Sequence, residues 1–410
     1  MILVRQCTGF LLVVMLLFKS NSATAQFDGN FEIERHYLAI ENFLDWKAYQ
    51  PPISWKYEWA LTPVGMQASV GSISMEEFYT YYDIRFTRDL GAWVSFYFNQ
   101  TETSFYRKET AYQEVEFRFG KTYALSLIGF PSHDKKNAQM GYALSRGKRY
   151  STSVVRISSI DQYFFYNEKN IDTEKNTRVD EYKKTPTFNR LELQFFSPES
   201  HMLQLDAKQV TKTELESENP QKTSTYESTG YSFTLDWIEQ NSWILGISGY
   251  VHGEYREQIP ESPAADNPDL KQDLMLQWLD LYFHTVLSEK NILTIGILGS
   301  KFNNQINSSF PESEYDCLFT TAQIYGVWKR KRSDWFQWVF SMQAGDAVLQ
   351  KDYIGIEETV DDHTTELKAG VGVILTRQDN YRLFANTTWD LDIFQTRQWD
   401  GGNVQLQIVF

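Results

Sequence analysis

The sequence has 410 residues, a length that suits two or three ordinary domains or one large β-barrel. It carries 24 tyrosines, 28 phenylalanines and 12 tryptophans, and its net charge is −14. A chain with this acidic balance is a poor nucleic-acid binder, so we expect no nucleic-acid partner.

Residues 1–25 have the composition of a secretory signal peptide. Arg5 supplies the positive start, residues 9–18 form an apolar run (GFLLVVMLLF), and residues 23–25 (ATA) give a small-residue cleavage pattern. The run is shorter than the roughly 20 residues that a membrane-spanning helix needs, which makes an N-terminal anchor the weaker interpretation. We therefore predict export and a mature chain that begins near Gln26.

Cysteine content and hydropathy limit the architectures open to the predicted mature chain. It keeps one cysteine, Cys317, so it can form no intrachain disulfide and no cysteine metal cluster. Its net charge is −16 after two basic residues leave with the signal peptide. No later segment holds 18 consecutive apolar residues, and without transmembrane helices a membrane protein must be a barrel.

Apolar and polar residues alternate with period two along much of the sequence. The alternation is clear in residues 381–393, 231–237 and 114–119, and it predicts strands with one apolar and one wet face. Several of these segments reach the roughly 9 to 11 residues of a tilted membrane-spanning strand, and aromatic residues gather near their ends. A soluble β-sandwich is the alternative, because aromatic residues favour strands there too.

The connections between the predicted strands alternate between short and long. Short polar turns include 120–121, 239–242, 288–291 and 329–334. The longer connections between them are predicted as loops and include 167–187, 213–228, 256–272, 303–314 and 345–363. An up-and-down membrane barrel has this alternation, with short turns at one edge and long loops at the other.

The strand count predicts an all-β, transmembrane up-and-down antiparallel barrel. About 17 strands are expected after residue 78 and one to three among residues 31–73, so an even total of 18 is the prediction, with 16 and 20 as alternatives. The segment 53–63 (ISWKYEWALTP) is expected to be an early strand. We assign 51–410 to one barrel and leave 26–50 as a lead-in or first strand.

The last predicted strand carries a resemblance to a known class. Apolar residues alternate at its end and an aromatic residue closes it; they are Val404, Leu406, Ile408 and Phe410. The sequence resembles the Gram-negative outer-membrane β-barrels, porins and channels among them. The resemblance implies delivery by the barrel-assembly machinery into the outer membrane, and contact with its lipid and lipopolysaccharide.

Motifs for metals, cofactors and catalysis are absent from the sequence, so no cofactor is expected. There is no zinc, haem, nucleotide or calcium pattern, and the six histidines are scattered. Asp280, Tyr282 and His284 share one wet strand face and are the one group worth testing for hydrolysis. No nucleophile motif accompanies them, because GISGY at Gly246 lacks the required spacing.

Charged residues on the predicted wet faces are the candidate functional residues. The candidate pore-lining residues are Glu114, Glu116, Arg118, Arg190, Glu192, Asp206, Lys208, Asp280 and His284. They could orient polar solutes in a channel or could cross-link the barrel wall. The acidic loops at 256–273 and 345–363 would attract cations or simply keep the outer edge soluble.

These features favour a non-enzymatic outer-membrane channel that passes small polar solutes or serves the outer-membrane step of an export system. The alternatives are a barrel that encloses or scaffolds a protein partner, periplasmic or inside the lumen, and a membrane-embedded hydrolase.

Overall fold

The structure is a computed structural model, and it describes most of the chain from residue 58 onward. The described residues are 58–72, 78–103, 108–120, 122–131, 138–161, 179–197, 201–219, 222–240, 243–264, 268–310, 314–353, 358–377, 380–391 and 399–410. The predicted signal peptide (1–25) and the uncertain segment 26–50 lie outside these residues.

Within the described residues, nineteen strands form a single sheet. The first nine are β1 (Gly65–Ser72), β2 (Phe78–Asp89), β3 (Val94–Thr103), β4 (Lys108–Phe119), β5 (Tyr123–Phe130), β6 (Gln139–Arg146), β7 (Ser153–Asp161), β8 (Val179–Lys184) and β9 (Thr187–Ser197). The others are β10 (His201–Asn219), β11 (Lys222–Gln240), β12 (Trp243–Pro260), β13 (Leu270–Ser288), β14 (Asn291–Ser308), β15 (Tyr315–Ser333), β16 (Phe336–Tyr353), β17 (Glu358–Arg377), β18 (Tyr381–Asp390) and β19 (Trp399–Val409).

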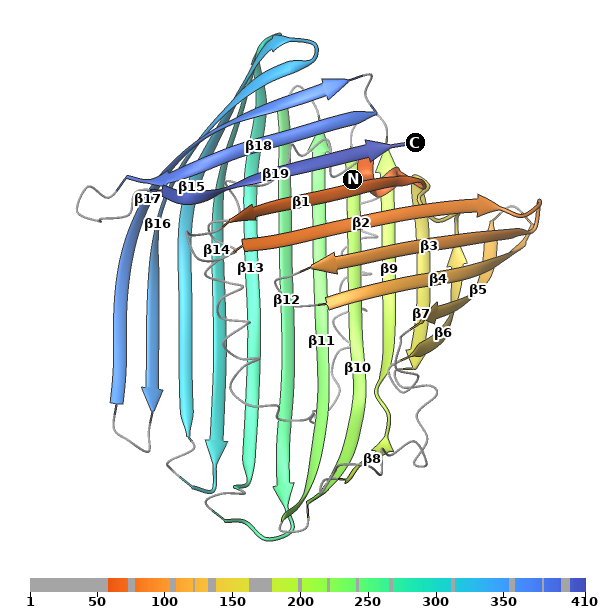
Figure 1. The fold of residues 1–410 in the computed structure, drawn as a ribbon, viewed down its shortest axis with the longest axis vertical. Helices are drawn as coiled ribbons and strands as arrows, with labels where there is room; N and C mark the ends of the chain where they lie inside the picture. Colours follow the sequence, from red (N-terminus) through yellow and green to blue (C-terminus); the bar gives the residue numbers. More distant parts are fainter. Residues whose placement is uncertain are drawn as a thin grey trace, which may run out of the picture.

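The sheet closes on itself as an antiparallel barrel. Each strand pairs with its neighbour in sequence, except that β8 and β9 both pair with β10 and together form one stave. The ring closes between β1 and β19, which pair in continuous register from Gly65 opposite Val409 to Ser72 opposite Gly402. The barrel therefore has 18 staves, as predicted, and Figure 1 shows the C-terminal strand lying beside β1.

The alternation in the sequence separates the two faces of the barrel wall. On β19 the amides of Asn403, Gln405 and Gln407 are buried inside, whereas Val404 and Phe410 are exposed on the outer face. On β14 the outward Ile295 and Ile297 are 45% and 58% exposed. A closed barrel with an exposed apolar outer face is suited to lipid, where every strand backbone must find its partners within the sheet.

Aromatic residues mark one edge of this apolar face. Trp243, Trp328 and Trp338 lie near the short turns on the outer side of β12, β15 and β16. Trp328 stacks on Phe340 with ring centroids 5.3 Å apart, and its indole nitrogen donates to the Asn291 side chain at 3.2 Å. Such aromatic girdles lie at the membrane interface, so the short turns lie at one membrane surface.

Strands β10–β17 are much longer than predicted. They contain 18 to 20 residues each, and they continue through most of the segments expected to be loops, including 213–228 and 345–363. Figure 1 shows these strands as a tall wall, with β1–β4, β18 and β19 crossing in front of it. The prediction of loops was wrong because a strand beyond the lipid needs no apolar face, while its backbone ladder continues unchanged.

The prediction of an early strand over 53–63 is also wrong for residues 58–63, the part that the structure describes. Residues 58–61 form a helical turn, and the Trp59 side chain is buried inside the barrel. Strand alternation was misleading here because Trp59 meets a buried polar partner on the inner wall, not lipid.

A lysine placed in the apolar face should measure where the lipid contact ends. On β14, Ile297→Lys should cost about 2–4 kcal/mol of unfolding free energy, because its charge would face hydrocarbon. Gln305→Lys lies on the same outer face, beyond the native outward Lys301, and should cost under about 0.5 kcal/mol. Urea unfolding in lipid vesicles measures both; equal costs would contradict this placement of the membrane.

Candidate functional site

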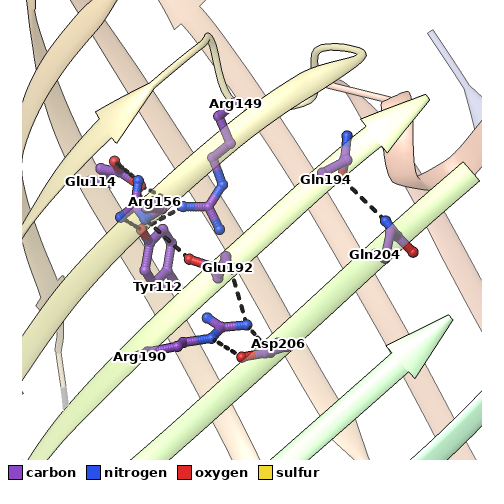
Figure 2. Close-up of polar contacts among 9 residues, drawn as sticks. All are labelled: Tyr112, Glu114, Arg149, Arg156, Arg190, Glu192, Gln194, Gln204 and Asp206. Carbon is purple, nitrogen blue, oxygen red and sulfur yellow. Dashed lines mark hydrogen bonds and ion pairs between the residues drawn. The ribbon is translucent and has the colours of Figure 1, made fainter. Parts of the chain in front are cut away.

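A cavity inside the barrel brings three of the nine predicted residues together on its wall, Arg190, Glu192 and Asp206. Its volume is about 590 Å³, and it lies between the helical turn at 58–61 and the inner faces of β2–β4, β7 and β9–β11. Figure 2 shows the polar side chains on its wall, which come from β4, β7, β9, β10 and the turn after β6.

Glu114 is the most buried charge of this site. Its carboxylate accepts hydrogen bonds from Arg149 at 2.5 Å and Arg156 at 2.6 Å, and from the Tyr112 hydroxyl. The side chain of Glu114 has no solvent exposure, whereas that of Arg149 is 20% exposed. The pairing offsets the cost of burying the carboxylate, so these side chains form a fixed wall.

The ion pairs continue across the next strands as a ladder. Arg156 contacts Glu192 at 3.1 Å, and Glu192 contacts Arg190 at 3.2 Å. Arg190 then binds Asp206 through two parallel hydrogen bonds of 2.8 and 2.5 Å. Arg190 and Asp206 are 34% and 38% exposed, so the ladder runs from a buried end at Glu114 to an end that faces the cavity.

Strand register explains this arrangement. Arg156 lies directly opposite Glu192, which lies directly opposite Asp206, so β7, β9 and β10 place their charges in one row. Small inner side chains, Ser126 and Ala143, occupy β5 and β6 between Glu114 and this row. Glu114 can therefore reach Arg156 across two strands.

Three members of the site were missed in the sequence. Tyr112 and Arg156 occupy inner positions on predicted strands, and a charged residue within VVRISS was a signal that could have identified Arg156. Arg149 comes from the turn at 147–152, where Gly147 has φ of 93°. A Cβ at Gly147 would lie 2.0 Å from the Ser153 carbonyl oxygen, so this turn needs glycine. A turn residue has no alternation that would predict its direction.

The helical turn is held against the opposite wall by a second set of polar contacts. Asp83 is buried and accepts hydrogen bonds from the Trp59 indole at 2.8 Å, from Arg85 at 3.1 Å and from the Asn99 amide. Arg85 also donates to the Trp59 carbonyl at 2.7 Å. The turn therefore occupies a fixed position inside the barrel and forms one side of the cavity.

A third set of charges lies at the short-turn edge. Glu116 accepts hydrogen bonds from Tyr97 and Arg118, both at 3.1 Å. Arg118 also reaches Asp89 at 2.9 Å, and Asp89 binds Lys148 at the same distance. These pairs connect successive short turns at this edge of the barrel.

The remaining predicted residues lie on the inner face but in other surroundings. The ammonium of Lys208 lies 4.0 Å from the centre of the Phe188 ring. Asp280 accepts a hydrogen bond from Tyr325 at 2.9 Å, and His284 pairs with Thr294 at 2.8 Å. All nine candidate residues thus point inward, while their role in lining a solute path stays a prediction.

The described residues contain no group of three or more metal-ligating side chains. Nor do they include a helix long and apolar enough to cross a membrane. What they contain is a closed sheet with an apolar exterior and a charged interior.

The chain is a transmembrane up-and-down β-barrel. No protein-family model and no curated protein matches its sequence. Among solved structures it is similar to CdiB from Acinetobacter baumannii, with 10% identity and a TM-score of 0.40, over 85% of this chain and 60% of that chain.

Two further barrels are similar over 85% of this chain and 99% of their own lengths. One is a bacterial polysaccharide outer membrane secretin, with 9% identity and a TM-score of 0.37. The other is Pseudomonas aeruginosa OccK10 (OpdN), with 11% identity and a TM-score of 0.37.

The two ends of the charge ladder should differ in their effect on stability. Glu114→Gln should cost about 3–5 kcal/mol of unfolding free energy, because it removes the only fully buried carboxylate of the ladder from the buried Arg156 and the partly buried Arg149. Asp206→Asn, at the exposed end, should cost under about 1 kcal/mol. Urea unfolding in vesicles, followed by tryptophan fluorescence, compares them; similar costs would show that the ladder is equally hydrated throughout.

Proposed function

We propose that this barrel is a non-catalytic channel through which small polar solutes cross the outer membrane. The observation that carries the proposal is the cavity whose wall presents Arg190, Glu192 and Asp206, each partly exposed, within a closed ring of 18 staves. A barrel of about this size leaves room for an aqueous path.

The balance of charges in the cavity favours solutes that are dipolar or carry both signs of charge. Three guanidinium groups and three carboxylates form the ladder in Figure 2, so its formal charges cancel. The alternation produces a strong local field with little net potential. We infer weak discrimination between simple cations and anions, and better passage for solutes that can hydrogen-bond to both kinds of group.

Opposite changes at the exposed end of the ladder should shift ion selectivity in opposite directions. Arg190→Gln leaves a net negative wall and should move the reversal potential in a salt gradient toward cations. Asp206→Asn leaves a net positive wall and should move it toward anions. Planar-bilayer recordings measure both shifts.

The neutral change Gln204→Ala, on the same strand as Asp206, serves as the matched control and should leave the reversal potential unchanged. Folding is checked by migration on a gel before and after boiling in detergent. A folded protein without conductance would overturn the channel proposal, and unchanged selectivity would place the solute path away from this ladder.

Removal of the Trp59 side chain should enlarge the cavity from the side of the helical turn. Trp59→Ala should raise single-channel conductance, because the indole lines the cavity and is fixed there by Asp83. Trp335→Ala removes an indole that is 63% exposed at a short turn and serves as the control. Equal conductance in the two variants would mean that the turn lies outside the solute path.

A role in enclosing a protein partner is a second candidate, favoured by one inner surface. Partly buried Leu276, Trp278 and Leu349 cover a buried apolar cluster on the inner faces of β13–β15, which contains Leu274, Leu298, Phe302, Cys317 and Phe319. An apolar inner wall suits a packed occupant better than a water-filled path. Co-purification of a stoichiometric protein, lost when the partly buried Leu349 is changed to Asp in a barrel that still folds, would support this candidate over the free channel.

A further inference from the structure

The outer face of β17–β19 carries an apolar groove at the short-turn edge. Its volume is about 650 Å³. Its floor contains Leu375, Leu383 and Leu406, which lie directly opposite one another across the three strands. The groove is therefore a continuous apolar channel on the surface that faces lipid.

Aromatic and basic side chains stand at the end of this groove. Trp335, Tyr381 and Arg377 line it together with Asp334. The Trp335 carbonyl accepts a hydrogen bond of 2.9 Å from the Thr376 backbone. This bond fixes the turn at 334–335 against β17. The polar end of the groove thus lies at the level of the aromatic girdle, where lipid headgroups lie.

Two more arginines stand on the other side of the same turn. Arg330 and Arg332 are exposed and share the outward face of β15 with Trp328. Arg330 lies directly opposite Trp338 on β16, so a guanidinium group and an indole are neighbours at this edge. Arg332 precedes the turn at 334–335, and Arg377 ends β17 two residues beyond Leu375, which lies opposite Phe336 just after the turn.

The arginines are available for a ligand. Among the described residues, no carboxylate forms an ion pair with Arg330, Arg332 or Arg377. The nearest acid in sequence, Asp334, binds Lys331 at 2.7 Å, and this hydrogen bond lowers the pKa of its carboxyl group. Four consecutive basic residues, 329–332, thus precede the turn and face one acid, Asp334, in a chain whose net charge is −14.

We propose that this groove, with Arg377 in its lining and with Arg330 and Arg332 on the same edge of β15, forms a binding site for an anionic phospholipid. An acyl chain lies along the three leucines, and the headgroup phosphate meets the guanidinium groups, whose planar donors match phosphate oxygens. Trp335 and Tyr381 contact the glycerol region between them. A zwitterionic headgroup fits less well, because its ammonium would lie among three positive charges.

Native mass spectrometry of the detergent-solubilised barrel tests this assignment. The protein is incubated with mixed micelles that contain phosphatidylglycerol or phosphatidylcholine with the same acyl chains. The wild-type barrel should retain phosphatidylglycerol in preference to phosphatidylcholine. The variant R330Q/R332Q/R377Q should lose that preference by roughly one to two orders of magnitude.

The matched control is R88Q/R146Q, which removes two outward arginines from the short-turn ends of β2 and β6, on another part of the wall. It should retain phosphatidylglycerol as the wild type does. Leu383→Trp fills the groove without changing any charge and should weaken retention of the lipid. Gel migration before boiling confirms that each variant is folded.

Three outcomes would overturn the proposal. Equal retention of the two lipids by the wild type would remove the headgroup preference. Equal losses in the triple variant and the control would show a general charge effect. Unchanged lipid retention in Leu383→Trp would show that the acyl chain does not lie in the groove, even if the arginines bind phosphate. Conductance is a separate measurement, so failure here would leave the channel proposal standing.

Discussion

The closure of β1 on β19 is the constraint on which the rest of this structure depends. In hydrocarbon, an unpaired backbone N–H or C=O costs several kcal/mol, so a sheet can span the membrane only when it has no free edge. Here the two terminal strands pair over eight residue positions, and Phe410 adds a backbone hydrogen bond to the Val64 carbonyl. Once the ring is closed, alternate residues must face lipid or the interior, and each side chain has one of two environments.

Inside the barrel, the charged side chains must be stabilised away from bulk water. Charged side chains on facing strands are held close together in a space that water only partly fills, so they need partners. The ladder from Glu114 to Asp206 meets that need by alternating signs across β4, β7, β9 and β10. Its exposure increases along its length, which links a rigid, buried end to an end that a solute can contact. The same pairs therefore stabilise the wall and set the chemistry of the cavity.

The sequence predicted the barrel well because apolar and polar residues alternate along each strand, and in a closed barrel this alternation decides which side chains face lipid and which face the interior. The 18 staves, the pairing of the terminal strand with the first, and the inward direction of Glu114, Arg190 and Asp206 all follow from alternation and parity. The alternation could not predict which charged side chains pair with one another. Arg149 lies in a turn, and Arg156 reaches Glu114 across two strands, so neither contact has a sequence spacing that reveals it. The predicted ends of the strands were wrong for another reason. Beyond the lipid, a strand can carry polar residues on both faces while its backbone hydrogen bonds continue.

The two edges of the barrel differ in a way that follows from their surroundings. At the long end, β10–β17 continue beyond the apolar face, and the outer side of the wall turns polar, as Lys301 on β14 shows. At the short end, tight turns bring indoles and guanidinium groups to the level where headgroups lie. A net negative protein would be repelled by anionic lipid unless its positive charge were concentrated where contact occurs. The arginines around the turn at 334–335 provide positive charge there, so the short edge can contact anionic headgroups although the net charge of the protein is negative.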